Sequence, residues 1–152
     1  IIGECCHFID LLRYVADAPI ESHTNAIMPT RTRDTLTTTL SFTNGTIATL
    51  HYFANGSRAF PKERLEVFVA GRILAIDNFR SLRGFGWNGF RRQSLWRQDK
   101  GQAACVAAFL DAVSGRRREQ IPADQLEEVA LACIEIARSR DGEGGASAEG
   151  HR

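Results

Sequence analysis

The 152-residue sequence lacks any long apolar run. No stretch approaches the roughly 20 apolar residues that a helix needs to cross a bilayer. The first residues also do not resemble a secretory signal peptide, which combines basic, apolar and small residues in that order. These absences predict a soluble, cytoplasmic protein with no membrane as a partner.

Neither sign of charge predominates in the sequence. It has 19 Lys and Arg against 18 Asp and Glu, which gives a formal net charge of +1. This balance argues against a protein whose main role is to coat nucleic acid or an anionic membrane, although local basic patches remain compatible with it. We therefore expect no nucleic-acid partner.

Cysteine is scarce, and its spacing does not suit a metal. The sequence has no C-x-x-C pair, and three of its cysteines fall on apolar helical stripes with no His at ligand spacing. A disulfide framework is improbable in a domain of this size with so few cysteines. The sequence thus predicts no metal site and buried, reduced thiols at Cys5, Cys6, Cys105 and Cys133.

The sequence also has no G-x-G-x-x-G after a predicted strand. The chain therefore cannot by itself be a dinucleotide-binding domain of the Rossmann type. Its length is enough for one domain with a hydrophobic core and too short for two of ordinary size. Because it begins at Ile1 with a helix-like run, we expect it to be a piece of a longer chain.

Helical spacing is present near both ends of the chain. A helix-like run over residues 3–17 ends before Pro19, because proline biases its predecessor away from helical angles. Two more helices are expected, one over 103–113 with Asp99 as N-cap and one over about 124–138. The predicted inward face of the second helix comprises Cys105, Ala108, Phe109 and Ala112.

Strand-like patterns fill the middle of the chain. A strand is expected over about 20–28, and a hairpin over 35–53 turns at Asn44-Gly45. Asn-Gly favours a two-residue type I′ loop, which would place Phe42 opposite Ile47. A second hairpin joins β-rich runs at 64–69 and 72–77. Both faces of the first hairpin carry apolar groups, which suits a sheet with helices on one face and a partner domain or subunit on the other.

The order of elements predicts an α+β fold. Helices would pack on one face of a mostly antiparallel, open β-sheet of about five strands. We expect one substrate-binding and oligomerisation domain over 1–140. From residue 141 the sequence is rich in Gly, Ala and Glu, so a flexible tail is expected over 141–152.

The first predicted helix places polar groups in an otherwise apolar segment. Cys5, Phe8, Ile9, Leu12 and Val15 recur at the spacing of a buried stripe, whereas a second face carries Gly3, His7, Asp10 and Tyr14. A histidine beside a carboxylate can carry proton transfer, because histidine titrates near neutral pH. The same spacing also suits a surface or interdomain pair.

The segment from about residue 78 to residue 100 interleaves glycines, aromatic residues and arginines. Basic and aromatic residues together can hold single-stranded nucleic acid by stacking and phosphate contacts. They can also cover a pocket in which arginines hold a phosphate and an aromatic ring covers a sugar. A solvated loop pinned by its aromatic side chains is the third interpretation.

Taken together, an ordered set of motifs resembles the C-terminal half of the Gfo/Idh/MocA oxidoreductases. More narrowly, it is similar to the branch in which this unit follows a zinc-alcohol-dehydrogenase-like unit. The resemblance covers nearly all of residues 1 to 140. It is carried by Gly3–Tyr14, Thr43–Ile47, His51–Gly56, Phe60–Val67 and Leu95–Gln102.

The resemblance implies a two-domain enzyme whose N-terminal Rossmann domain binds NAD or NADP and lies outside this chain. His7 matches the family's histidine that exchanges a proton with a sugar or polyol hydroxyl, and Asp10 matches a frequent acid three residues on. The family's preceding acid falls at Gly3, with Glu4 one residue later. The implied catalytic residues are therefore His7, Asp10 and Glu4.

The remaining expectations concern the substrate and the assembly of the protein. The resemblance implies a sugar, nucleotide sugar or polyol as substrate, an inactive isolated fragment, and homo-oligomerisation through the open sheet. A non-catalytic assembly module that dimerises through this sheet is the alternative. The predicted substrate contacts are Tyr14, Asn55, Arg92, Trp96 and Arg97.

Overall fold

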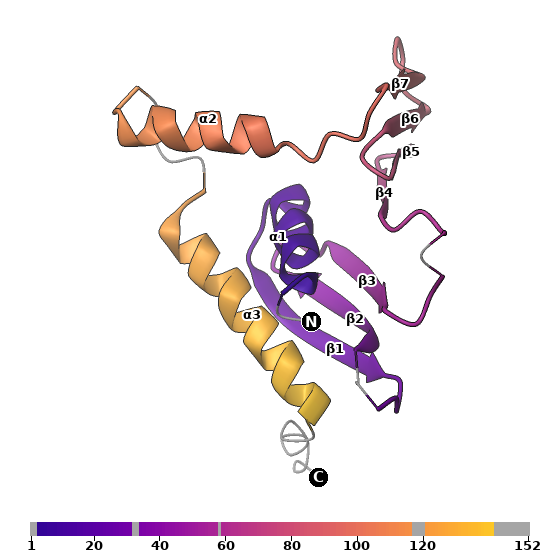
Figure 1. Cartoon of the computed structure of the whole chain (residues 1–152), viewed down its shortest axis with the longest axis vertical. Helices are drawn as coiled ribbons and strands as arrows, with labels where there is room; N and C mark the ends of the chain where they lie inside the picture. Colours follow the sequence, from indigo (N-terminus) through magenta and orange to yellow (C-terminus); the bar gives the residue numbers. More distant parts are fainter. Residues whose placement is uncertain (1–2, 32–33, 58, 117–120, 142–152) are drawn as a thin grey trace. The chain divides into compact units, whose positions relative to one another are not determined.

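The computed structural model describes residues 3–31, 34–57, 59–116 and 121–141 (Figure 1). The chain divides into two compact units, one formed by residues 1–55 with 121–152 and the other by residues 56–120. The tail predicted over 141–152 lies outside the described residues except for Asp141, which ends a helix instead. Short breaks at 32–33, 58 and 117–120 also lie outside them. None of the described helices is long and apolar enough to cross a membrane.

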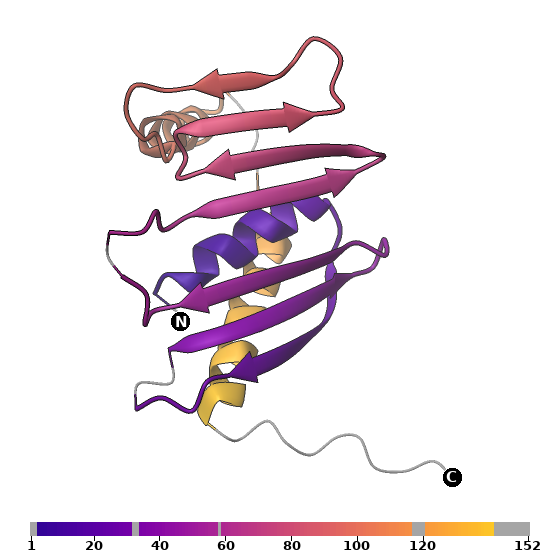
Figure 2. The ribbon, with the colours of Figure 1, turned by 90° about the vertical axis from the view of Figure 1, so that its right-hand side faces the viewer.

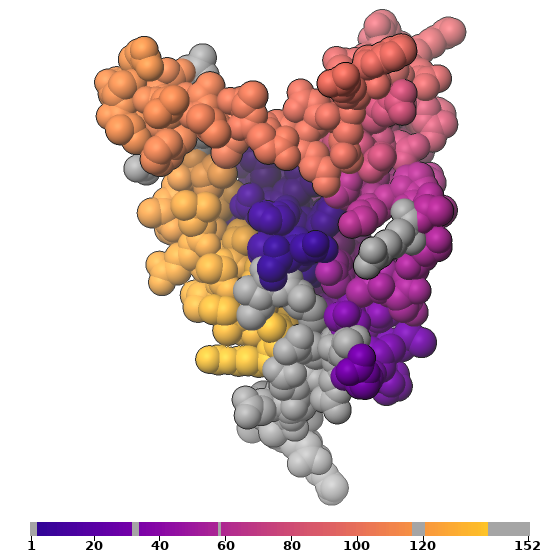
Figure 3. Space-filling view, viewed as in Figure 1, coloured from indigo at the N-terminus to yellow at the C-terminus, as the bar shows by residue number. Residues whose placement is uncertain are grey.

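The first unit is a three-stranded antiparallel sheet with two helices on one face (Figure 2). Its sheet order is β1-β2-β3, and helices α1 and α3 contact each other as well as the sheet. The side chains of both helices lie against each other in the space-filling view (Figure 3). The elements are α1 (Cys5–Ala16), β1 (Ile20–Ile27), β2 (Thr35–Phe42), β3 (Ile47–Phe53) and α3 (Ala123–Asp141).

The core of this unit lies between the sheet and the two helices. Leu36, Leu40 and Phe42 alternate along β2 on the face toward the helices and are all but inaccessible to solvent. The helices close this layer with side chains at helical spacing, among them Ile9 of α1 and Ile136 of α3, which have no exposed surface. Burial of one apolar face of each element accounts for the predicted helical and strand periodicities.

A polar contact ties both helices to the start of β1. The side chain of Arg13 in α1 donates to Glu128 of α3 at 3.2 Å. The same carboxylate accepts a hydrogen bond from the backbone N–H of Ile20. Because charge-assisted hydrogen bonds are strong and directional, this contact fixes α1 against α3 and β1.

The first hairpin differs from its predicted turn. Ser41, not Phe42, stands opposite Ile47. The N–H of Phe42 donates to Thr46 at 3.0 Å, and only Gly45 in the turn has a positive φ, +82°. The loop therefore has three residues, with its last in the left-handed region. Asn44 keeps an ordinary φ while its side-chain amide donates to the carbonyl of Ala16 at the end of α1, at 2.9 Å.

The second unit contains a four-stranded antiparallel sheet of order β4-β5-β6-β7. The predicted hairpin is confirmed, with Val69 opposite Arg72 across a turn in which Ala70 and Gly71 both have positive φ. The strands β6 and β7 were not predicted. The elements are β4 (Arg64–Val69), β5 (Arg72–Asp77), β6 (Ser81–Phe85), β7 (Arg92–Ser94) and α2 (Gln102–Val113).

The α+β class with open antiparallel sheets is confirmed, but the expected single sheet of about five strands is wrong. Sheets of three and four strands are separated by the segment between Phe53 and Arg64. That segment contains Gly56 and Pro61, which interrupt a strand because glycine is conformationally free and proline cannot donate to the ladder. The role expected of residues 1–140, substrate binding and oligomerisation by one domain, stays a prediction.

Helix α2 forms where predicted, but its expected burial is wrong. None of its residues is buried, and Phe109 is 66% exposed. Cys105 is exposed too, so the prediction of four buried thiols fails there, whereas Cys5 and Cys133 are buried and Cys6 is half-buried. The N-cap is Gly101 rather than Asp99, whose carboxylate accepts the Gly101 N–H at 2.8 Å.

Candidate functional site

His7 lies in the first turns of α1 with its side chain exposed. The complete burial of Cys5 and Ile9 fixes the rotation of the helix about its axis. Tyr14 follows His7 by seven residues and therefore returns to nearly the same side of the helix. Its side chain is 70% exposed. The structure thus places His7 and Tyr14 on one accessible edge of α1.

Asp10 does not join His7. Residues three apart on a helix differ by about 60° in direction, and the Asp10 carboxylate is half-buried while His7 is exposed. One oxygen of Asp10 is buried without a hydrogen-bond partner, and within the described residues no hydrogen bond joins it to His7. Burial raises the pKa of the Cys133 thiol to about 11, and the neighbouring Cys6, Cys5 and Asp10 add to the shift. The Asp10 side chain is therefore less accessible to solvent than that of His7.

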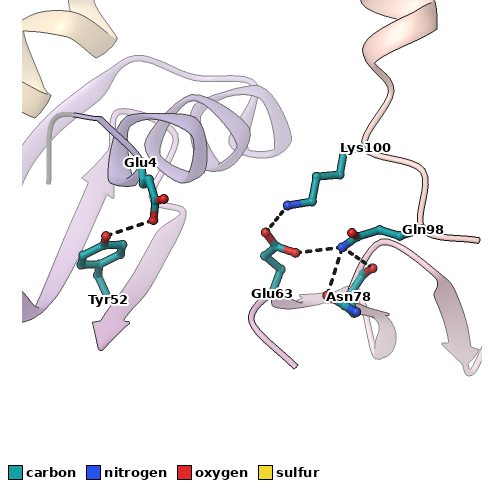
Figure 4. Close-up of polar contacts among 6 residues, drawn as sticks. All are labelled: Glu4, Tyr52, Glu63, Asn78, Gln98 and Lys100. Atoms are coloured by element: carbon teal, nitrogen blue, oxygen red, sulfur yellow. Dashed lines mark hydrogen bonds and ion pairs between the residues drawn. The ribbon is translucent and has the colours of Figure 1, made fainter. Parts of the chain in front are cut away.

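Glu4 is held by a residue that the sequence did not single out. It precedes α1 as its N-cap, with a non-helical φ of −132°. Its carboxylate accepts a hydrogen bond from the Tyr52 hydroxyl of β3 at 3.1 Å (Figure 4). Burial raises the pKa of Tyr52, and the carboxylate of Glu4 raises it further. The only sequence signal for this pair was that Tyr52 shares the helix-facing side of its strand with Leu50.

Asn55 follows β3 and is exposed. Its side-chain amide lies 3.7 Å from the sulfur of Met28. This is a weak contact, since thioether sulfur is a poor acceptor. The donors of Asn55 are therefore available to a ligand.

The remaining predicted contacts, Arg92, Trp96 and Arg97, belong to the second unit. Arg92 in β7 donates to the Ser94 hydroxyl at 2.9 Å. Trp96 is 89% exposed, and Arg97 is exposed beside it. The predicted site residues are thus divided between the two units, with Glu4, His7, Asp10, Tyr14 and Asn55 in the first.

The segment that carries Trp96 and Arg97 is pinned by a polar network that sequence reasoning missed (Figure 4). The Gln98 amide donates to Glu63 at 3.1 Å and to the backbone carbonyl and side-chain oxygen of Asn78 at 3.0 Å each. Lys100 forms an ion pair with the same Glu63. The exposed side chains of Trp96 and Arg97 therefore project from a stretch of backbone that these contacts hold in place.

No protein-family model matches the sequence. No curated protein matches it either. Solved structures do match. UDP-N-acetylglucosamine 3-dehydrogenase GnnA from Acidithiobacillus ferrooxidans is 21% identical with a TM-score of 0.70, over 86% of this chain and 44% of that chain.

Two further solved structures match over most of this chain. The dehydrogenase MviM from Clostridium difficile is 16% identical with a TM-score of 0.69, over 90% of this chain and 46% of that chain. The WlbA dehydrogenase from Bordetella pertussis, in complex with NADH and UDP-GlcNAcA, is 18% identical with a TM-score of 0.55, over 91% and 42%.

The fold is that of one domain of the Gfo/Idh/MocA-type dehydrogenases. The resemblance expected from the sequence is thereby confirmed at the level of the fold. This chain spans less than half the length of these dehydrogenases, which agrees with the expected C-terminal domain.

Proposed function

We propose that this chain is the substrate-binding domain of an NAD(P)-dependent Gfo/Idh/MocA oxidoreductase that acts on a sugar, nucleotide sugar or polyol. The observation that carries the proposal is the shared fold over most of this chain and under half of each dehydrogenase. GnnA is named for a UDP-sugar, and the WlbA structure holds one. A nucleotide sugar is therefore the first substrate class to test.

We propose that the dinucleotide binds outside this chain. All strand pairs in both sheets of the described chain are antiparallel, so no βαβ unit is present to hold a pyrophosphate. We therefore assign NAD or NADP to a domain outside this chain. The isolated chain is expected to be inactive.

We assign the proton step to His7. Oxidation of a hydroxyl to a carbonyl releases a proton, and an exposed imidazole can accept it from the hydroxyl oxygen. Tyr14 on the same edge of α1 offers a hydroxyl to the sugar. The substrate side is completed in the proposal by Asn55, Arg92, Trp96 and Arg97.

The two acids receive different roles. Glu4 acts as a positioning residue, because its bond to Tyr52 fixes the residue that precedes α1, three positions before His7. Asp10 is assigned a role through its negative charge, since residues three apart on a helix are neighbours. Neither is assigned a direct hydrogen bond to His7.

The activity is tested in the longer protein that carries this chain. Reduction of NAD or NADP is followed with a panel of UDP-sugars, free sugars and polyols. His7→Ala should lower turnover by about two to four decades, the usual scale for a general acid or base. His51→Gln is the matched control, since His51 lies on the face of the first sheet that points away from the helices and forms a hydrogen bond with the Thr37 hydroxyl. Wild-type turnover in His7→Ala would overturn the assignment.

We also propose that the chain self-associates through the second sheet. Phe68, Ile73 and Phe85 stand opposite one another across β4, β5 and β6, and the two phenylalanines are 70% and 51% exposed. An exposed apolar row of this kind favours a protein partner. Scattering should show a dimer that Phe68→Asp converts to a monomer. A wild-type monomer at high concentration would reject this second function.

A further inference from the structure

A hollow of about 540 Å³ lies at the end of the β6–β7 hairpin in the second unit. It is lined by basic and aromatic side chains and by glycines, with no acidic residue among them. The side chains that matter here are Arg83, Phe85, Trp87, Phe90, Arg91 and Arg92. The residues that line the hollow belong to the second unit, whereas His7 belongs to the first.

The charge around this hollow is unbalanced over a long stretch of sequence. Residues 78–98 contain no Asp or Glu, although the whole chain is close to neutral. Five positive charges therefore fall in one segment, at Arg80, Arg83, Arg91, Arg92 and Arg97. Such a concentration of one sign attracts anions.

The pairing of β6 with β7 concentrates this charge further. Arg83 stands directly opposite Arg92, so both side chains lie on the same face of the sheet. Like charges at directly opposed positions destabilise a sheet. In the described chain neither arginine has an acidic partner, whereas Arg64 on the same sheet is paired with Glu66. An anion between the two guanidinium groups would remove the repulsion.

Two of the aromatic side chains, Trp87 and Phe90, hold the hairpin in place and are not free to stack on a base, whereas Phe85 is exposed. The indole N–H of Trp87 donates to the Ile73 carbonyl at 3.0 Å, and Arg72 lies 5.0 Å above the ring. Phe90 packs on Gly84 so closely that a Cβ there would come within 2.6 Å of the ring. The arginines are thus displayed from a fixed frame. This arrangement suits a compact anion better than single-stranded nucleic acid, which needs exposed stacking surfaces.

We propose that this hollow is a binding site for a phosphate group, held by Arg83 and Arg92 with Arg91 at its rim. Guanidinium groups bind phosphate oxygens through paired N–H donors, which favours arginine over lysine in such sites. Arg92 is already oriented by its bond to Ser94. The site does not depend on the role proposed for His7.

The test is titration of the folded chain with inorganic pyrophosphate, followed by calorimetry at low ionic strength. Arg83→Gln and Arg92→Gln should each weaken binding about tenfold or more, the scale of a lost charge-assisted bond. Arg138→Gln, an exposed substitution on α3 with the same change of charge, should change it less than twofold. Arg92→Gln should also raise the melting temperature of the ligand-free chain, because the like-charge pair is removed.

Three results would overturn the proposal. One is the absence of pyrophosphate binding at millimolar concentration. Another is that Arg138→Gln weakens pyrophosphate binding as much as Arg92→Gln does. Potassium chloride at matched ionic strength that produces the same signal as pyrophosphate would count in the same way, because either result would mean unspecific screening of charge. The third is much tighter binding of a thymidine oligonucleotide that depends on Trp96, which would assign the segment to nucleic acid. Arg92 is also a proposed substrate contact, but none of these measurements uses enzymatic activity, so failure of the phosphate site can be distinguished from failure of the proposed oxidoreductase function.

Discussion

The hydroxyl of Tyr52 donates a hydrogen bond to the carboxylate of Glu4 at 3.1 Å. This bond joins the last helix-facing side chain of β3 to the residue that begins α1. It spans 48 positions of sequence. The start of the helix that carries His7 is thereby fixed to the sheet.

Replacing Tyr52 by Phe removes this bond and leaves the ring in place. The free energy of unfolding should fall by about 0.5–1 kcal/mol, the lower range for a partly exposed hydrogen bond. Urea denaturation measures the change. Tyr14→Phe is the control, because its exposed hydroxyl has no protein partner in the described chain. Equal losses in both variants would show that the Glu4 contact does not stabilise the fold.

The buried thiols predict how stability changes at alkaline pH. Burial raises the pKa of Cys5 and of Cys133 to about 11 each. A group whose pKa is raised on folding stabilises the protein below its unfolded pKa of about 8.5 and ceases to do so as the pH passes its folded pKa. The free energy of unfolding should therefore fall between about pH 8.5 and 11. Cys133→Ala should make this fall shallower.

The rate at which each cysteine reacts with a thiol reagent also tests which thiols are buried. Cys105 is exposed on α2, whereas Cys5 and Cys133 are buried in the first unit. A disulfide reagent at neutral pH should modify Cys105 at once and the two buried thiols only on unfolding, since the thiolate must form and be reached. Cys105→Ser, made in a Cys6→Ser background because Cys6 is half-buried, should abolish the fast phase. A fast phase that persists in this variant would contradict the assigned burial.

The hydrogen bonds of Gln98 are expected to hold the segment after β7 in place. Gln98 donates to Glu63 and Asn78, and the neighbouring Asp99 N–H donates to the Phe79 carbonyl at 3.2 Å. Gln98→Ala should accelerate hydrogen exchange at Asp99 several-fold while global stability changes by less than about 1 kcal/mol, as for exposed polar contacts. Gln93→Ala, an exposed change on β7, is the control. Unchanged exchange in Gln98→Ala would show that the network does not hold this segment.

Periodicity predicted the parts of the fold that bury one face. Alternation from Leu36 to Phe42 and helical spacing around Cys133 and Ile136 each describe a half-buried element, and the structure shows them as such. The turn at Asn44 could not be predicted in this way. Its side chain bonds to Ala16, a contact 28 residues away that no local pattern encodes.

The remaining misses have equally specific causes. Strands β6 and β7 were hidden because Gly84, Trp87 and the arginines do not alternate as apolar and polar residues. Tyr52 was missed because its partner Glu4 is distant in sequence. Spacing placed Asp10 with His7, and that pairing stays a prediction, because Asp10 is half-buried while His7 is exposed.

The central claim is that His7 exchanges the proton with the substrate hydroxyl, and the pH dependence of kcat/KM in the longer protein tests it most directly. A general base gives an acidic limb that reports its own ionisation. His7→Ala is expected to remove this limb along with about two to four decades of rate, and added imidazole is expected to restore part of the rate. An unchanged limb in His7→Ala, with no response to imidazole, would contradict it.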